Sequence, residues 1–180
     1  MATFKLAGKY FLFSLIFFTG NISIAQTSVT CDAQNRSCMT DHILNLAEQI
    51  EKTRWRDQTY REAAKTMAAD GRADAALLLI DKIETPDTKA LTIRGIGMEA
   101  AMAGKVTENL FAKLRTETEK ITHPPSYGIA LTYIAMAQAY AGDDAGAAQT
   151  ASDMQNEDLR NKMDKLLEKP DELMNELKEF

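Results

Sequence analysis

The chain has 180 residues, with 21 Lys and Arg against 26 Asp and Glu and a formal net charge of −5. This length fits a single domain. An acidic chain repels phosphate backbones, so the composition argues against nucleic acid as a partner. The charges are interspersed along the chain, which argues against a disordered acidic tail.

Residues 1–25 have the three parts of a secretory signal. Lys5 and Lys9 form the basic start, an apolar run covers 10–18, and Ser23-Ile24-Ala25 offers small residues to a signal peptidase. We expect cleavage before Gln26 and a periplasmic or secreted protein with no membrane attachment. The alternative is a leader kept as an anchor, although its apolar run is short for a span of about 20 residues.

The two cysteines of the chain, Cys31 and Cys38, both follow this leader. Exported proteins meet an oxidising compartment, where an even number of cysteines pairs. We therefore expect a Cys31–Cys38 disulfide within an N-terminal segment 26–40. A metal site is the alternative, but it would need more Cys or His nearby, and only His42 is close.

Residues 41–180 are expected to form one all-α domain built on an internal repeat. Two Ala-rich segments, 90–104 and 130–142, resemble each other and end at Gly, and a weaker copy ends at Gly71. The apolar residue that ends each second helix recurs with spacings of 33, 38 and 33, at Ile50, Ile83, Ile121 and Met154. A repeat of this length predicts stacked antiparallel helical hairpins.

The helices are predicted from apolar periodicity and from Gly and Pro breaks. The first should start near Asp41, with Asp41 as its cap, and 53–56 should form a joint. Pro86, Pro124 and Pro125 are expected at breaks, and the extra residues of the second copy are assigned to a longer fifth helix. The remaining predicted helices cover 57–69, 73–83, 88–103, 106–121, 126–141, 143–154, 157–168 and 170–178. Small residues seven positions before each turn glycine, namely Ala64, Gly97 and Ala135, predict close helix packing.

The first copy carries a recognisable pattern: the turn glycine Gly71, Ala76 five residues later, Ile80 four further on, and a break near Pro86. This pattern resembles a divergent tetratricopeptide-type repeat over about 41–170. The large aromatic of the first helix is Tyr60 in one copy but an aliphatic residue in the others, and Asn109 replaces a small Ala. The resemblance implies a right-handed stack of about three to four hairpins. Their first helices would line a concave face for binding or scaffolding, with no activity of its own.

No catalytic or cofactor pattern is evident. The two histidines, His42 and His123, are about 80 residues apart, and no Ser, His and Asp arrangement stands out. Gly95 and Gly97 imitate a dinucleotide fingerprint but do not follow a strand. We expect no enzyme activity, no cofactor and no bound metal. The methionines suggest a copper-handling alternative because thioethers bind Cu(I), but core or groove packing explains them better.

Residues 54–56 form the one aromatic and basic cluster, Arg54-Trp55-Arg56. Trp and Arg are enriched at binding hot spots, so a partner contact is one interpretation. The other is that Trp55 packs the joint between the first two helices.

Counting back from the turn glycines gives a predicted binding stripe on the first helix of each hairpin. The stripe holds three cations and no acid, followed by Met and Tyr. We expect it to bind an extended segment that carries an acidic residue or a free carboxylate beside apolar side chains. Ordinary solvated surface is the alternative. The residues of the stripe are Gln58, Arg61, Lys65, Leu91, Arg94, Met98, Met102, Ile129, Thr132, Met136 and Tyr140.

The sequence therefore favours a non-enzymatic, exported scaffold that binds a protein or an extended peptide. An accessory subunit or inhibitor of an exported enzyme, acting through loops such as 122–127, is the first alternative. Copper handling is the second. The sequence leaves the oligomeric state open.

Overall fold

The computed structural model describes residues 30–32, 34–169, 172 and 175, and within these ranges all regular structure is helical. The predicted leader 1–25 lies outside the described residues. Of the predicted last helix 170–178, residues 172 and 175 are described, and both are helical. The all-α class is confirmed for the described chain. Its elements are α1 (Arg36–Ala47), α2 (Thr53–Ala69), α3 (Ala73–Leu77), a 3-10 turn (Ile80–Lys82), α4 (Pro86–Met102), α5 (Leu110–Glu119), α6 (Pro124–Tyr140), α7 (Asp144–Ser152) and α8 (Glu157–Glu168).

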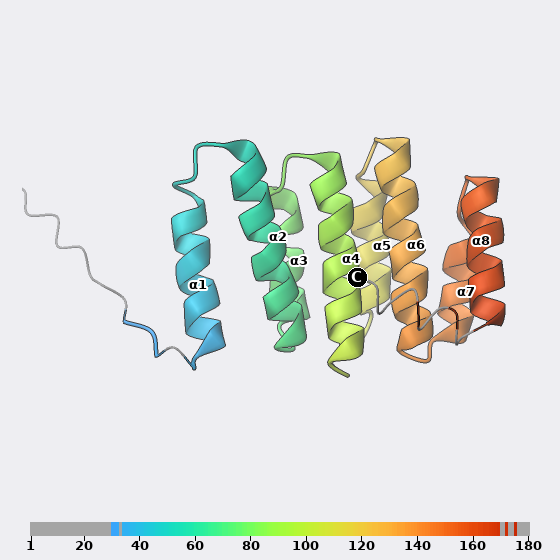
Figure 1. Ribbon diagram of the computed structural model, residues 1–180, viewed down its shortest axis with the longest axis horizontal. Coiled ribbons are helices and arrows are strands. Elements are labelled where there is room, and N and C mark those ends of the chain that lie inside the picture. Colours follow the sequence, from blue (N-terminus) through green and yellow to red (C-terminus); the bar gives the residue numbers. More distant parts are fainter. Residues whose placement is uncertain (1–29, 33, 170–171, 173–174, 176–180) are drawn as a thin grey trace, which may run out of the picture.

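The helices form two layers (Figure 1). Helices α2, α4, α6 and α8 stand side by side in front, and α3, α5 and α7 lie behind them, while α1 stands beside α2 at the N-terminal end. Helices α2, α4 and α6 each pack against the next front helix and against the back helix that follows in the chain, and α8 packs against α6 and α7. We call the exposed side of the α2, α4, α6 and α8 layer the front face.

The three turn glycines end the front helices in the same way. Gly71, Gly104 and Gly142 have φ values of +83°, +64° and +81°. After each glycine the next backbone N–H reaches back to a carbonyl five residues earlier, as in Arg72 N to Met67 O at 2.8 Å. This is the Schellman arrangement, which needs a left-handed residue and therefore favours glycine. The same bond recurs at 2.8 Å in Lys105 N to Ala100 O and Asp143 N to Gln138 O.

The small residues seven positions before these glycines lie in the core, as predicted. Ala64 and Ala135 are fully buried. A Cβ on Gly97 would lie 3.3 Å from Leu114 on α5 and 3.4 Å from Ala137 on α6. Gly97 thus lets α4 approach both its back partner and its front neighbour.

Several predicted boundaries are wrong, and the prolines explain two of them. Pro86 and Pro124 are the first residues of α4 and α6, whereas the predicted helices began two residues later. Proline suits this position because its missing N–H would be unpaired there in any case. At the other end of the chain α1 begins at Arg36, and its cap is Asn35, which accepts from Cys38 N at 3.0 Å, instead of Asp41.

The joint between the first helices also lies elsewhere than predicted. Residues 53–56 form the first turn of α2, and the connection consists of residues 48–52. The extra residues of the second copy form the loop 105–109 before α5, which is shorter than predicted. Asn109, the residue before α5, has a left-handed φ of 60°, so the helix cannot extend back through it.

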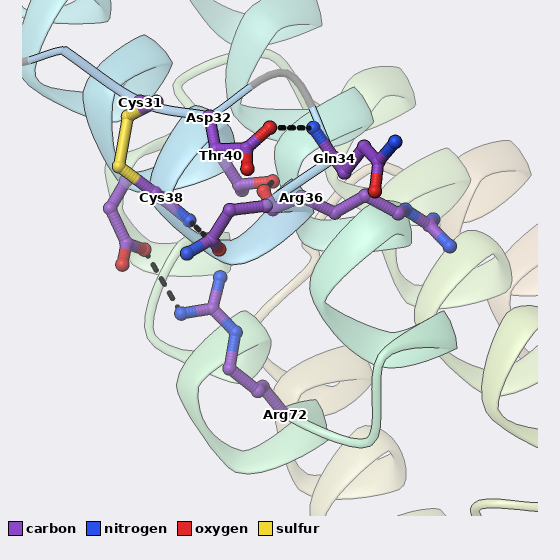
Figure 2. Close-up of a disulfide and its surroundings, with 9 residues drawn as sticks. Cys31, Asp32, Gln34, Arg36, Cys38, Thr40 and Arg72 are labelled. Carbon is purple, nitrogen blue, oxygen red and sulfur yellow. Dashed lines mark hydrogen bonds and ion pairs between the residues drawn. A yellow bond between two sulfur atoms is a disulfide. The ribbon is translucent and has the colours of Figure 1, made fainter.

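The disulfide between Cys31 and Cys38 is confirmed. Cys38 lies in the first turn of α1, so the bond fastens the preceding segment to this helix. Beneath it, Arg72, the residue between Gly71 and α3, reaches toward α1 (Figure 2). Its Nη1 lies 3.0 Å from Asp41 Oδ1. A second ion pair joins Arg36 to Asp70 at 3.2 Å, so α1 is held to the α2–α3 turn by two charge contacts.

None of the helices in the described part of the chain is long and apolar enough to cross a membrane.

Candidate functional site

Part of the predicted binding stripe comes together as a groove between α2 and α4. Six of its residues, together with Gly95 and Glu99, line a hollow of about 230 Å³, which we call the front groove. These six are Arg61, Lys65, Leu91, Arg94, Met98 and Met102. This volume is smaller than the about 300–1,000 Å³ that pockets for small organic ligands enclose. It suits individual side chains of a peptide.

Gly95 is what allows the two walls of the front groove to meet. A Cβ at this position would overlap the aliphatic stem of Lys65 on α2. The lysine therefore lies flat over the glycine, with its apolar stem packed and its ammonium group at the rim. The dinucleotide-like pattern that singled out Gly95 in the sequence gave no indication that this glycine receives Lys65.

A second hollow of about 200 Å³ continues along the front face between α6 and α8, and we call it the side pocket. Ile129, Thr132 and Met136 of the predicted stripe line it, with Tyr133 from α6 and Lys162 from α8. Arg94 of the front groove lies 4.3 Å from the centre of the Tyr133 ring. This cation–π contact joins the rims of the two hollows.

Two residues of the predicted stripe lie apart from these hollows. Tyr140 lines a different hollow at the glycine-turn edge, beside Arg115 and Asp143. Gln58 faces α1, where it lines a shallow hollow with Ile43 and Trp55. The structure thus brings seven of the eight proposed partner-binding residues onto the two front hollows and leaves Tyr140 outside them.

The expectation of a front face without acids is wrong. Glu99 lines the front groove, and Glu62 lies 2.8 Å from Arg61 Nη2 and 3.0 Å from Lys65 Nζ. Partial burial raises the pKa of Glu62, but hydrogen bonds from Lys65 and Arg61 outweigh it and hold this pKa below its usual value. Glu62 therefore stays ionised at neutral pH and offsets part of the positive charge of α2.

The methionines of the stripe differ in exposure, and this difference decides which of them can be substituted to test binding without disturbing the core. Met136 is 3% exposed and Met98 is 8% exposed, so both belong chiefly to the core. Met102 is 48% exposed and is the apolar side chain that the front groove offers to solvent.

The structure also brings together a Ser, a His and an Asp that the sequence analysis did not connect. His123 Nδ1 lies 2.6 Å from Ser126 Oγ, and Ser126 Oγ donates to Asp87 Oδ1. A nucleophilic serine needs a base that accepts its proton and a path for substrate. Ser126 is fully buried and already gives its proton to the carboxylate. The trio therefore fastens the start of α6 to α4 and does not provide a nucleophile.

Trp55 and its basic neighbours take different roles. Arg56 is used within the protein, with Nη1 3.3 Å from Ile50 O and an ion pair to Glu84. Trp55 is 53% exposed on the first turn of α2, and Arg54 lies 5.6 Å from its ring centre. The tryptophan is thus available to solvent beside α1 and away from the front groove.

Lys162 is a front-face residue that the sequence analysis missed, although a signal for it exists. It lies eight residues after Met154, as Gln58, Leu91 and Ile129 lie eight after Ile50, Ile83 and Ile121. No turn glycine follows α8, so counting back from the turn glycines does not reach it. Counting eight residues forward from Met154 identifies Lys162 as the equivalent position.

Among the described residues, no group of three or more His, Cys, Asp or Glu could hold a metal ion. No protein-family model, curated protein or solved structure matches the chain.

Proposed function

We propose that this chain is an exported, non-enzymatic scaffold that binds an extended peptide segment across its front face. The proposal includes a tetratricopeptide-like superhelical stack, with α2, α4, α6 and α8 as the helices that line the binding surface. The repeated glycine turn, the disulfide and the signal-like leader support this assignment.

The observation that carries the proposal is the contact between the two front hollows. Arg94 lies over Tyr133, so the front groove and the side pocket form one line of side-chain-sized hollows across the four front helices α2, α4, α6 and α8. A peptide in extended form places alternate side chains on one side, about 6.6–7 Å apart, and can fill such hollows in succession.

The chemistry of this line favours an acidic and apolar segment. Arg61, Lys65 and Arg94 supply cations around the apolar side chain of Met102. Arginine binds carboxylates with two parallel hydrogen bonds, and methionine adapts to differently shaped apolar groups. Glu62 and Glu99 limit the positive charge, so the apolar contacts must contribute to the affinity.

A second candidate function is suggested by a larger hollow of about 680 Å³ at the proline edge of the fold. Pro124, Tyr127, Ile129 and Leu159 give it a largely apolar lining. It includes part of the segment 122–127, predicted as a loop but containing the first turn of α6, through which an accessory subunit or inhibitor of an exported enzyme would act.

A random peptide library displayed on phage and screened against the mature protein tests the first proposal. We expect enrichment of segments with Asp or Glu beside large apolar residues. A synthetic peptide of the enriched sequence should bind at least ten-fold more weakly to Arg94→Glu and to Met102→Glu in calorimetry. Met136→Glu is unsuitable because it places a charge in the core.

Matched controls lie on the back of the molecule. Leu78→Glu introduces the same charge at a residue that is 71% exposed on the back layer, and Lys113→Glu reverses a back-layer cation. Both should retain the wild-type affinity. Enriched peptides that bind Arg94→Glu and Met102→Glu as tightly as the wild type would place the binding site elsewhere.

A further inference from the structure

Helix α8 continues the front stripe with cations. Counting from Met154, its stripe positions are Lys162 and Lys165, and the count continues to Lys169 directly after the helix. These three correspond to Leu91, Arg94 and Met98 on α4. Lys162 lines the side pocket, which agrees with this register. Across α2, α4, α6 and α8 the stripe therefore contains six cations and no acid, on a chain with a net charge of −5.

The other side of α8 is acidic where earlier front helices are apolar. Positions that face the back partner are Ile93 and Gly97 on α4 and Leu131 and Ala135 on α6, all of them buried. On α8 the equivalent positions are Asp164 and Glu168, and both are exposed. This side of α8 lacks the apolar surface on which α5 and α7 pack against their front helices.

The chain that follows α8 matches the front face in charge and composition. Residues 170–180 contain four acids, one lysine and four large apolar residues. Asp164 and Glu168 would repel such a segment, whereas Lys162, Lys165 and Lys169 would attract it. At its start, Glu172 Oε1 already lies 2.7 Å from Lys169 Nζ.

We propose that residues 170–180 bind the front face of the same molecule, so that they occupy the proposed peptide-binding surface until a partner displaces them. The inference rests on the proposed function, because it assigns this surface its first occupant. The acids of the segment would meet the cations of α8 and Arg94, and its Leu, Met and Phe side chains would meet the apolar parts of the two hollows.

The segment is long enough for this path. Eleven extended residues would span about 36 Å, and the helical conformation of residues 172 and 175 shortens this to about 33 Å. Packed helices lie about 8–10 Å apart, so the front groove between α2 and α4 is about 20–25 Å from α8. A segment that starts at the end of α8 can therefore cross α6 and reach Arg94 and Met102.

A tethered segment competes strongly with an external peptide because its effective concentration is on the order of millimolar. The test is fluorescence anisotropy with a labelled synthetic peptide that has the sequence of residues 170–180. It is titrated with the full mature chain and with a variant carrying Asp171→Asn, Glu172→Gln, Glu176→Gln and Glu179→Gln. We expect the variant to bind the peptide at least ten-fold more tightly, and Lys162→Glu in the same variant to remove most of this gain.

A charge-matched control carries Glu51→Gln, Glu108→Gln, Glu119→Gln and Asp144→Asn, which change the net charge equally at exposed positions outside the segment. It should bind like the wild type. Equal affinity of the wild type and the segment variant would overturn the inference while leaving peptide binding intact. Absence of binding to both would also overturn it, and the library screen would then judge the proposed function independently. Dimers that dissociate when the segment is neutralised would show binding between molecules and overturn binding within one.

Discussion

The starts of α4 and α6 are equivalent places in successive hairpins, and the protein stabilises them differently. Both helices begin with a proline that follows a residue in extended conformation, Thr85 or His123. Neither of these preceding side chains caps its own helix. In both cases a carboxylate from the previous front helix lies at the junction instead.

At the start of α4 this carboxylate is Asp57, and it is fully buried. Its Oδ2 accepts from Glu84 N at 3.2 Å and Thr85 N at 3.0 Å, and lies 3.0 Å from Thr85 Oγ1. Its Oδ1 is buried without a hydrogen-bond partner among the described residues. A single oxygen atom, Oδ2, thus accepts all the hydrogen bonds that Asp57 makes at this junction.

At the start of α6 the carboxylate is Asp87, whose side chain is 75% exposed. It contacts side chains only, through Ser126 and His123. Water can replace its hydrogen bonds, whereas water cannot reach Asp57. The comparison teaches that equivalent acids in a repeat stabilise the fold unequally, because burial and backbone contacts decide the cost of removing them.

The largest effect should come from Asp57→Ala. It leaves two backbone N–H groups at the α4 junction without their acceptor, and we expect a loss of about 3 kcal/mol in the free energy of unfolding. Urea denaturation followed by circular dichroism measures it. Asp57→Asn, which keeps one acceptor oxygen, should lose clearly less. A loss below about 0.5 kcal/mol for Asp57→Ala would show that this junction does not depend on the buried carboxylate.

Ser126→Ala should have an intermediate effect of about 1 kcal/mol, because it removes one buried hydroxyl while leaving its partners open to water. The same urea titration measures it. Thr116→Ala is a suitable control, since it removes an exposed hydroxyl that bonds only within its own helix. A loss as large as that of Asp57→Ala would mean that the two junctions are equally critical.

Asp87→Ala should have the smallest effect, at most about 0.5 kcal/mol, as is typical of exposed charge contacts. Combined with Ser126→Ala, it should add less than its single effect, because both changes remove the same hydrogen bond. Strict additivity in this double-mutant cycle would show that the Ser126–Asp87 bond contributes nothing to the stability.

Contacts local in the sequence were predictable. The turn glycines 71, 104 and 142 end their helices as expected, because a left-handed residue is needed wherever such a helix stops. The pairing of Cys31 with Cys38 followed from compartment chemistry and the absence of other thiols. The short fifth helix was missed because the left-handed Asn109 carries no unambiguous signal in the sequence.

The candidate site was predictable only in part. The count from the turn glycines placed Arg61, Lys65, Arg94, Met98 and Met102 in one stripe, and the structure gathers them in the front groove. The count could not reveal that Glu62, a neighbour outside the stripe, turns toward both Arg61 and Lys65. It also gave no measure of exposure, which separates Met102 from Met136.

The sequence by itself determined the helical class and the glycine turns that follow α2, α4 and α6, because apolar periodicity and turn residues act over a few positions. The tertiary structure decided which residues 27–39 positions apart meet, such as Asp57 with Thr85 and Asp87 with Ser126. It also decided that Gly95 receives Lys65 and that Arg94 lies over Tyr133. These contacts depend on the distance and rotation between packed helices, which no single segment of the chain specifies.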